Sequence, residues 1–391
     1  MTSIIPRLVG SIGALAAAIS LALPAIARDQ VEPRLPPEAD APIAILVDIS
    51  SGQVLHSRNA DRRFVPASIT KAMTTFVAFE LMQEGALTPS QTMTIRPETW
   101  REWNGKGSTM WLAADNPVRV EDLLIGIATV SANDASVVLA EGARGSVAAW
   151  TGLMNEKARA LGMTGSHFGT PNGWPDEGRT FTTANDLVKL AEAMTRQHPE
   201  KFAHYVGRRE FVWNGISQFN HDPITGRVRG ADGIKTGYTN EAGFGFLGTA
   251  KRNGQRLVMV IGGADRSGTR DRLAREYIEW GFTAFDREQL FSKGQQVSTA
   301  RVQGGSARQL GLVTDRIVRV NVPRGREGEL KATIRYDGPL RAPIAQGDQV
   351  AVLEVIVPGM DPARIPLFAD RSIEQAGLFS RIFNGLAGWF S

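Results

Sequence analysis

Cysteine is missing from the sequence, and histidine is scarce. The absence of cysteine excludes disulfides, thiolate metal sites, iron–sulfur clusters and a thiol nucleophile. The histidines form neither an H-E-x-x-H motif nor another spacing of paired metal ligands. The five of them are His56, His167, His198, His204 and His221. We therefore expect surface or structural histidines, no metal ion and no cofactor.

Net charge is also small. The 44 Lys and Arg residues nearly balance the 40 Asp and Glu residues, which leaves a formal charge of +4. So small an excess gives no argument for a nucleic-acid partner, and we expect none. The hydrophobic content of 42% is ordinary for a folded chain. The 391 residues allow more than one domain at about 100–200 residues each.

Beyond the N-terminus, no hydrophobic run approaches the length of a membrane span. At the N-terminus, Arg7 precedes the apolar residues 8–23, and small residues follow up to Ala27. This order is typical of a cleaved export signal, although a run of this length also permits an uncleaved anchor. We therefore predict a signal peptide at 1–27 and a protein that is exported to the periplasm or cell surface.

The remaining chain divides by composition. A proline-rich linker is expected at 28–41, a mixed region of helices and strands at 42–285, and a small all-β domain at 286–370. Hairpins are expected at Ile43–Leu55 and around Asn253-Gly254. Helices are expected at Ala67–Met82, Val120–Val130, Ala148–Leu161, Ala184–Thr195 and Arg270–Trp280.

The C-terminal residues 371–391 have a different pattern. Apolar and aromatic side chains recur there at helical spacing, with charged residues largely opposite them. This pattern predicts an amphipathic helix that lies on a membrane surface. The alternative is a terminal helix that docks on the protein's own surface.

A serine and a lysine three residues apart give the first chemical motif. Ser68 and Lys71 share a face of the predicted helix that Pro66 begins, so the Lys71 amine can reach the Ser68 hydroxyl. Serine needs an adjacent base to act as a nucleophile, and a lysine serves as that base when burial and a nearby cation lower its pKa. Ser68 is the only serine with a lysine at this spacing.

Two further motifs follow along the chain. Ser131 and Asn133 come directly after a predicted helix and offer a hydroxyl that relays a proton and an amide that binds a peptide. Lys235 and Thr236 offer a cation and a hydroxyl to a carboxylate, and Gly237 lets a ligand approach the backbone. Each of these two motifs is weak alone. Ser131 and Asn133 also suit an ordinary turn at a helix end, and Lys235 also suits an exposed edge strand. The three in this order are typical of penicillin-binding proteins and class A β-lactamases.

The chain resembles the low-molecular-weight penicillin-binding proteins, which are serine-type D-alanyl-D-alanine carboxypeptidases. The resemblance lies within about 42–285, and the β domain and tail also match the family's layout. The stretches that carry it are Pro66–Lys71, Gly107–Met110, Glu121–Leu124, Ser131–Ala135 and Asp232–Thr239. It implies an α+β fold, with a β-lactamase/transpeptidase-like catalytic domain of antiparallel sheet and helical subdomain. The chain departs from the family at Trp174, where a smaller residue is usual, and at 100–106, which is longer.

The resemblance also implies a mechanism on peptidoglycan stem peptides at the periplasmic face of the membrane. Ser68 would attack the terminal D-Ala–D-Ala bond while Lys71, kept neutral partly by Lys235, takes its proton. A β-lactam would mimic the substrate and inhibit the enzyme. The implied supporting roles are proton relay for Ser131, acyl-peptide binding for Asn133, carboxylate binding for Lys235 and Thr236 within the Lys235-Thr236-Gly237 motif, and an oxyanion hole from the backbone N–H groups of Ser68 and Tyr238.

Other functions stay open at this point. A D,D-endopeptidase or a β-lactamase would share the fold, and a peptidoglycan-binding scaffold would need no chemistry. The C-terminal β domain disfavours a β-lactamase, and the loop around Glu177 lacks the Glu-x-x-x-Asn pattern of a deacylating glutamate. The adjacent Asp176 and Glu177 do not form a glycosidase pair. The intact motif residues argue against a scaffold.

Overall fold

The computed structural model describes residues 3–4, 40–326 and 330–377. These form two compact units, one from the described parts of 35–50 and 54–282, the other from those of 1–34, 51–53 and 283–391. The expected signal peptide and linker lie outside the described residues, apart from residues 3–4 and 40–41. Within the described ranges, no helix combines the length and apolar character needed to cross a membrane.

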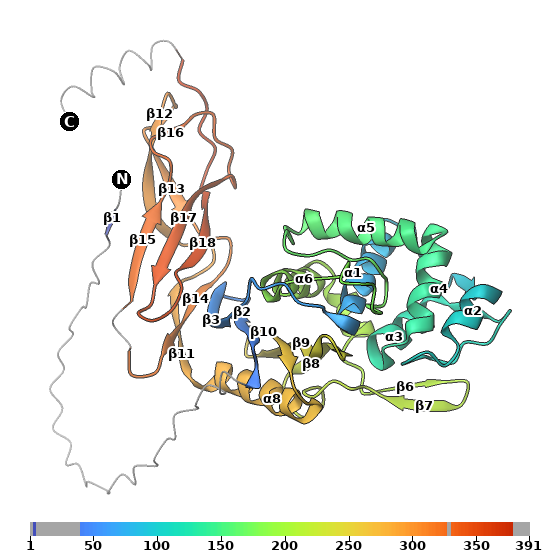
Figure 1. Cartoon of the computed structure of the whole chain (residues 1–391). Coiled ribbons are helices and arrows are strands. Elements are labelled where there is room, and N and C mark those ends of the chain that lie inside the picture. The colour runs from blue at the N-terminus through green and yellow to red at the C-terminus, as the bar shows by residue number, and fades with distance from the viewer. Residues whose placement is uncertain (1–2, 5–39, 327–329, 378–391) are drawn as a thin grey trace, which may run out of the picture. The chain divides into compact units, whose positions relative to one another are not determined.

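A five-stranded sheet forms the centre of the first unit (Figure 1). Its order is β3-β2-β10-β9-β8, with β8 at one edge, and β8–β9, β9–β10 and β10–β2 are antiparallel. Asn253 and Gly254 both have positive φ in the turn between β9 and β10, which confirms the predicted hairpin. The strands are β2 (Ile43–Asp48), β3 (Gln53–Arg58), β8 (Ala231–Thr239), β9 (Gly243–Arg252) and β10 (Gln255–Ala264).

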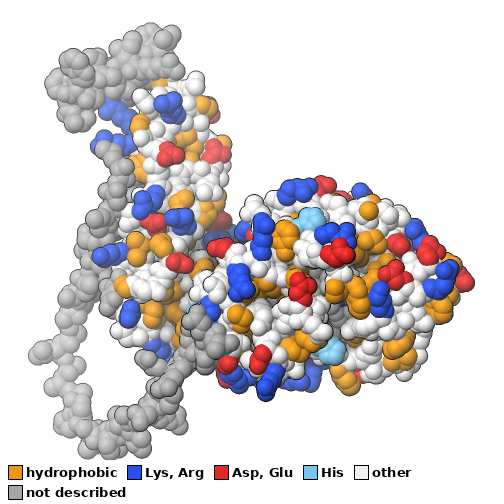
Figure 2. All heavy atoms as spheres, in the orientation of Figure 1, with side chains coloured by type: hydrophobic (Ala, Val, Ile, Leu, Met, Phe, Trp, Pro, Cys, Tyr) orange, Lys and Arg blue, Asp and Glu red, His pale blue; other side chains and the backbone are white. Residues whose placement is uncertain are grey.

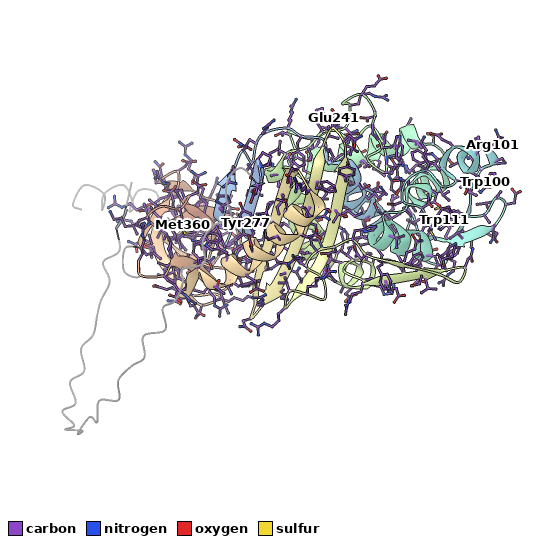
Figure 3. All side chains as sticks on the ribbon, turned by 60° about the horizontal axis from the view of Figure 1, so that its bottom comes forward. Trp100, Arg101, Trp111, Glu241, Tyr277 and Met360 are labelled. Carbon is purple, nitrogen blue, oxygen red and sulfur yellow. The ribbon has the colours of Figure 1, made fainter. Side chains whose placement is uncertain are left out.

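Helices cover both faces of this sheet, which explains why its central strands β2 and β10 are buried along nearly their whole length (Figure 1). On one face, the paired Ile45 and Val260 belong to a core shared with α1 (Thr70–Gln83) and α6 (Ala184–Gln197). On the other face lies α8 (Ser267–Thr283), whose Tyr277 ring packs against His56 at 5.4 Å between centroids (Figure 3).

A helical subdomain extends from the sheet, with Trp100 and Arg101 of α2 and Trp111 at its far end (Figure 3). The structure confirms the predicted helices at 67–82, 120–130, 148–161, 184–195 and 270–280, with small differences in their ends. The helix α4 was not predicted; it begins two residues after α3 ends, with Ser131 in left-handed conformation and Ala132 as its N-cap. The remaining elements of this unit are α2 (Pro97–Trp103), α3 (Val120–Val130), α4 (Asn133–Arg144), α5 (Val147–Ala160), α7 (Pro199–Tyr205), β4 (Thr92–Thr94), β5 (Pro117–Arg119), β6 (Glu210–Trp213) and β7 (Ile216–Phe219).

The second unit is built from β-strands, as its alternating short runs predict. A seven-stranded sheet has the order β1-β15-β17-β18-β13-β12-β16, and β11 pairs with β14. Leu312, Val320, Leu353 and Leu367 lie in its core without exposed surface. The strands are β1 (Ser3–Ile4), β11 (Phe285–Phe291), β12 (Gln296–Gln303), β13 (Gln309–Val313), β14 (Val318–Pro323), β15 (Lys331–Arg335), β16 (Leu340–Arg341), β17 (Gln349–Ile356) and β18 (Ala363–Ala369).

The expected amphipathic helix at 371–391 is wrong over residues 371–377. Ile373 pairs with Ile344 in an isolated β-bridge, and Gln375 pairs with Gly305. The Ile373 side chain is 1% exposed in a small apolar cluster of the β domain, so its burial decides the backbone conformation. Residues 378–391 lie outside the described residues.

Replacing Ile373 tests this correction. Ile373→Ala should lower the free energy of unfolding of the β domain by about 2–4 kcal/mol, because it leaves a cavity in a packed cluster. Glu374→Ala, at an exposed neighbouring position, should change it by less than about 0.5 kcal/mol. Urea unfolding followed by circular dichroism measures both, and equal small effects would show that Ile373 is not packed.

Candidate active site

A cavity of about 530 Å³ opens beside the edge strand β8. Its walls come from segments far apart in the sequence, so the fold brings together most of the predicted site residues. Those that line it are Ser68, Ser131, Asn133, Thr236, Gly237 and Tyr238, together with Asn172, Trp174, His221 and Arg270. Lys71 and Lys235 are not among the lining residues and are 0% and 5% exposed. The site therefore has one layer that faces the cavity and two lysines behind it.

Ser68 lies in η2 (Ala67–Ile69), a 3-10 turn that leads directly into α1. The sequence analysis expected one α-helix with Pro66 in its first turn, whereas Pro66 is the cap of the 3-10 turn. Ala67 has a φ of 48°, a conformation that residues with a Cβ rarely adopt. The strained turn presents Ser68 to the cavity instead of to the helix surface.

Two glycines let this turn sit where it does. A Cβ on Gly237 of β8 would lie 2.4 Å from the Pro66 carbonyl oxygen, and a Cβ on Gly173 would lie 1.8 Å from that of Ala67. No side chain fits at either position without displacing the backbone next to Ser68. Gly237, which is expected to let a ligand approach the backbone, lines the cavity, and the chain's own backbone at Pro66 also approaches it closely.

Lys71 has three polar partners in this buried position. Its Nζ lies 2.8 Å from Ser68 Oγ, 2.8 Å from Asn133 Oδ1 and 2.7 Å from the carbonyl oxygen of Asn172. Burial lowers the pKa of Lys71 well below its usual value, and the charge of Lys235 lowers it further, while Asp134 opposes the shift. These contacts give the amine the environment of a base, with the Ser68 hydroxyl in direct reach.

Ser131 and Asn133 are held by the link between α3 and α4. Ser131 caps α3 with a φ of 66°, and its side chain reaches the cavity wall. The Asn133 backbone N–H donates to the Ser108 carbonyl at 2.8 Å, and its Nδ2 donates to the Lys106 carbonyl at 3.0 Å. The loop at 106–108 thereby fixes the Asn133 amide against Lys71.

Positive charge gathers around β8. Burial and the nearby Arg270 lower the pKa of Lys235 to about 7. Arg270, in the first turns of α8, is 6% exposed and lines the cavity. His221 also lines the cavity, and burial together with Lys235 and Arg270 lowers its pKa. In Figure 2, by contrast, basic and acidic side chains are interspersed over the visible surface of this unit.

The sequence analysis missed three of these residues. Asn172 acts through its backbone carbonyl, which no side-chain pattern reveals. Arg270 was noted only as the start of a helix, and His221 was expected to be a surface or structural residue. In the part of the chain that the structure describes, no group of three His, Asp or Glu side chains is placed to hold a metal ion.

Gly237→Ala tests the close approach of η2 to β8. The new methyl group should destabilise the fold by about 1–3 kcal/mol through overpacking against the Pro66 carbonyl. Gly268→Ala is the matched control, because a Cβ there meets no atom within 4 Å. We expect Gly268→Ala to be neutral or slightly stabilising in a helix. Thermal unfolding of both variants measures the difference, and equal melting temperatures would contradict the contact.

The lowered pKa of Lys235 predicts a pH-dependent stability. The folded state loses its proton near pH 7 and the unfolded state near 10.5, so the unfolded state binds more protons between these values. Stability should therefore rise with pH across this window, by up to about 1.4 kcal/mol per pH unit from this group. Urea unfolding of the wild-type protein and Lys235→Met from pH 7 to 9 should show the difference growing. A constant difference would contradict the shift.

Comparison with known proteins agrees with the geometry of the site. Residues 30–266 match the family described as D-alanyl-D-alanine carboxypeptidase, and residues 285–375 match the C-terminal domain of penicillin-binding protein 5. The chain is 32% identical over 353 residues to the D-alanyl-D-alanine carboxypeptidase DacA of Escherichia coli. The aligned region covers 89% of this chain and 87% of the relative.

Solved structures show the same relationship. Penicillin-binding protein 5 from Haemophilus influenzae is similar with a TM-score of 0.77 and 29% identity, over 88% of this chain and all of that chain. A penicillin-binding protein from Listeria monocytogenes in its ampicillin-bound form is similar with a TM-score of 0.56 and 27% identity, over 62% of this chain and 98% of that chain. The chain therefore belongs to the D-alanyl-D-alanine carboxypeptidase family, the serine hydrolases of the penicillin-binding protein class.

Proposed function

We propose that Ser68 is the nucleophile of a D,D-carboxypeptidase that removes the terminal D-Ala from peptidoglycan stem pentapeptides. The observation that carries this proposal is the buried Lys71 amine, 2.8 Å from Ser68 Oγ. A carboxypeptidase that works through an acyl-enzyme needs a serine whose proton is taken by a neighbouring base. Lys71 and Ser68 supply both groups within one hydrogen bond.

The partners of Lys71 support its role as the base. Asn133 Oδ1 and the Asn172 carbonyl only accept hydrogen bonds. A neutral amine donates its two N–H bonds to them, and its lone pair is then left for the Ser68 hydroxyl. The Ser68 proton moves to this lone pair as Oγ attacks the substrate carbonyl. The lowered pKa of Lys71 favours the neutral form that this step needs.

The backbone N–H groups of Ser68 and Tyr238 would stabilise the negative charge that develops on the substrate carbonyl oxygen. Both residues line the cavity, and Gly237 brings their segments into contact. Half of the N–H groups of an edge strand such as β8 face away from its sheet partner. Preorganised donors of this kind supply a large part of the rate enhancement in acyl transfer.

The departing D-Ala needs a proton on its amine and a partner for its carboxylate. Ser131 would pass a proton to its amine, and Thr236 would bind its carboxylate. We assign the main carboxylate contact to Arg270, because it lines the cavity and a guanidinium offers a planar set of N–H donors that matches a carboxylate. Lys235, behind the wall, acts chiefly by lowering the pKa of Lys71. Water then hydrolyses the acyl-enzyme. A β-lactam would acylate Ser68 in the same way, and its adduct would be hydrolysed slowly.

Location and attachment rest on the sequence. The export signal at 1–27 supports a protein at the periplasmic face of the cytoplasmic membrane. The apolar and aromatic residues of 378–391 support attachment to the membrane surface, although 371–377 belong to the β domain. We retain 42–285 for the catalytic domain as part of this proposal, and extend the β-rich domain from the expected 286–370 to 286–377 because of the pairing of Ile373 and Gln375.

Intact-mass analysis after penicillin treatment tests the nucleophile. Wild-type protein should gain one penicillin adduct, mapped to Ser68, whereas a folded Ser68→Ala variant should gain none, because Ser68 combines a place in the cavity with the Lys71 amine within hydrogen-bond reach. Ser166→Ala, a hydroxyl placed outside the cavity, is the control and should be labelled like the wild type. Labelling of Ser68→Ala would contradict the assignment.

Substrate assays separate the related activities. D-Ala release from a stem pentapeptide is expected, with slow nitrocefin turnover. Rapid nitrocefin turnover without D-Ala release would indicate a β-lactamase, and cleavage of cross-linked dimers would indicate an endopeptidase. Binding of stem peptide without any release would indicate a scaffold.

A further inference from the structure

Two tryptophans and a lysine form a cluster at one wall of the catalytic cavity. The Lys106 ammonium lies 4.6 Å from the centroid of the Trp103 ring and 5.0 Å from that of Trp174. The two rings meet edge to face, with centroids 5.5 Å apart and planes at 89°. Both cation–ring distances are within the range in which the ring quadrupole attracts a cation. The cluster joins the end of α2 to the loop at 171–175.

The first arm of this cluster reaches Asn133. The Lys106 carbonyl accepts from Asn133 Nδ2 at 3.0 Å, and a carbonyl cannot donate. The Asn133 amide must therefore turn its NH2 group toward Lys106 and its oxygen toward Lys71. A side chain at position 107 would crowd this contact, because a Cβ on Gly107 would lie 2.9 Å from Asn133 Nδ2 and 3.1 Å from the Trp174 ring.

The second arm reaches the other acceptor of Lys71. The Trp174 backbone N–H donates to Asn172 Oδ1 at 3.0 Å, which ties the tryptophan to the residue whose carbonyl accepts from Lys71. The Thr74 hydroxyl donates to the Pro171 carbonyl at 2.5 Å and holds the start of the same loop on α1. The position of Trp174 and that of the Asn172 carbonyl are thus set together.

We propose that Trp103, Lys106 and Trp174 form a clamp that orients the Lys71 amine by fixing both of its acceptors, Asn133 Oδ1 and the Asn172 carbonyl. With both acceptors fixed, rotation about the Cε–Nζ bond is restricted, and the free position on Nζ faces Ser68. The three residues are positioning residues that act through Asn133 and Asn172. This inference rests on the proposed function, in which Lys71 is the base.

The clamp depends on the cation–ring contacts more than on an ion pair. Lys106 also contacts Glu102 at 3.3 Å, but the Glu102 side chain is 59% exposed. An exposed pair four residues apart contributes little. The rings of Trp103 and Trp174 both attract the Lys106 ammonium and hold it against the protein. This difference provides a matched control on the same lysine.

Stopped-flow acylation by a fluorescent penicillin tests the clamp on the full chain. Lys106→Met should lower the acylation rate constant at saturating penicillin by about tenfold to a hundredfold, because a displaced base loses its alignment with the reacting hydroxyl. The dissociation constant of the initial complex and the melting temperature should change little. Lys106→Arg should recover most of the rate, since a guanidinium also binds aromatic faces.

Two other variants make the test decisive. Glu102→Gln removes the ion pair only, so its acylation rate should equal that of the wild type. Trp103→Leu removes one ring from a residue that does not line the cavity, and it should lower the rate constant as Lys106→Met does. Unchanged rate constants in Lys106→Met and Trp103→Leu, with normal wild-type labelling of Ser68, would overturn the clamp alone. Absence of a Ser68 adduct in the wild type would overturn the proposed function and the clamp with it.

Discussion

The burial of one amine is the constraint on which the catalytic unit depends. Lys71 has no exposed surface, and its Nζ contacts Ser68, Asn133 and Asn172. A buried amine without partners would cost several kcal/mol, so three distant segments must converge on it with carbonyl or hydroxyl oxygens in place. The turn at Ser68, the α3–α4 link and the loop at 171–175 are all shaped by this requirement. Gly173 and Gly237 permit the convergence because neither carries a side chain.

The packing of these residues also brings three basic side chains close together, which lowers the pKa values of Lys71 and Lys235. Lys71, Lys235 and Arg270 concentrate positive charge where burial already disfavours it, so the protonated amines are destabilised together. The same arrangement that lowers the pKa values of Lys71 and Lys235 reduces stability below the pH at which these lysines lose their protons in the unfolded chain. A site that gathers buried positive charge therefore costs folding free energy, which the large apolar core of the unit offsets.

Local patterns predicted much of the secondary structure. The Asn253-Gly254 turn and the apolar stripe through Ile69, Met73 and Phe76 depend on neighbours in the sequence, and both are confirmed. Residues 371–377 show where such reasoning fails. Their helical spacing is real, but burying Ile373 beside Ile344 outweighs the weak preference of a short segment for helix. The helix α4 was missed because only Ser131, in left-handed conformation, and Ala132 separate it from α3.

By itself, the sequence determined the chemical types at the site, since a serine and a lysine three residues apart approach each other on any helical turn. The order of the three motifs also pointed to the family. Only the tertiary structure decided how the Lys71 amine is held, through the Asn172 carbonyl and the loop that orients Asn133. It also brought Arg270 and His221 to the cavity. These contacts join residues far apart in the chain, and burial and backbone hydrogen bonds, which set them, leave no signature in residue spacing.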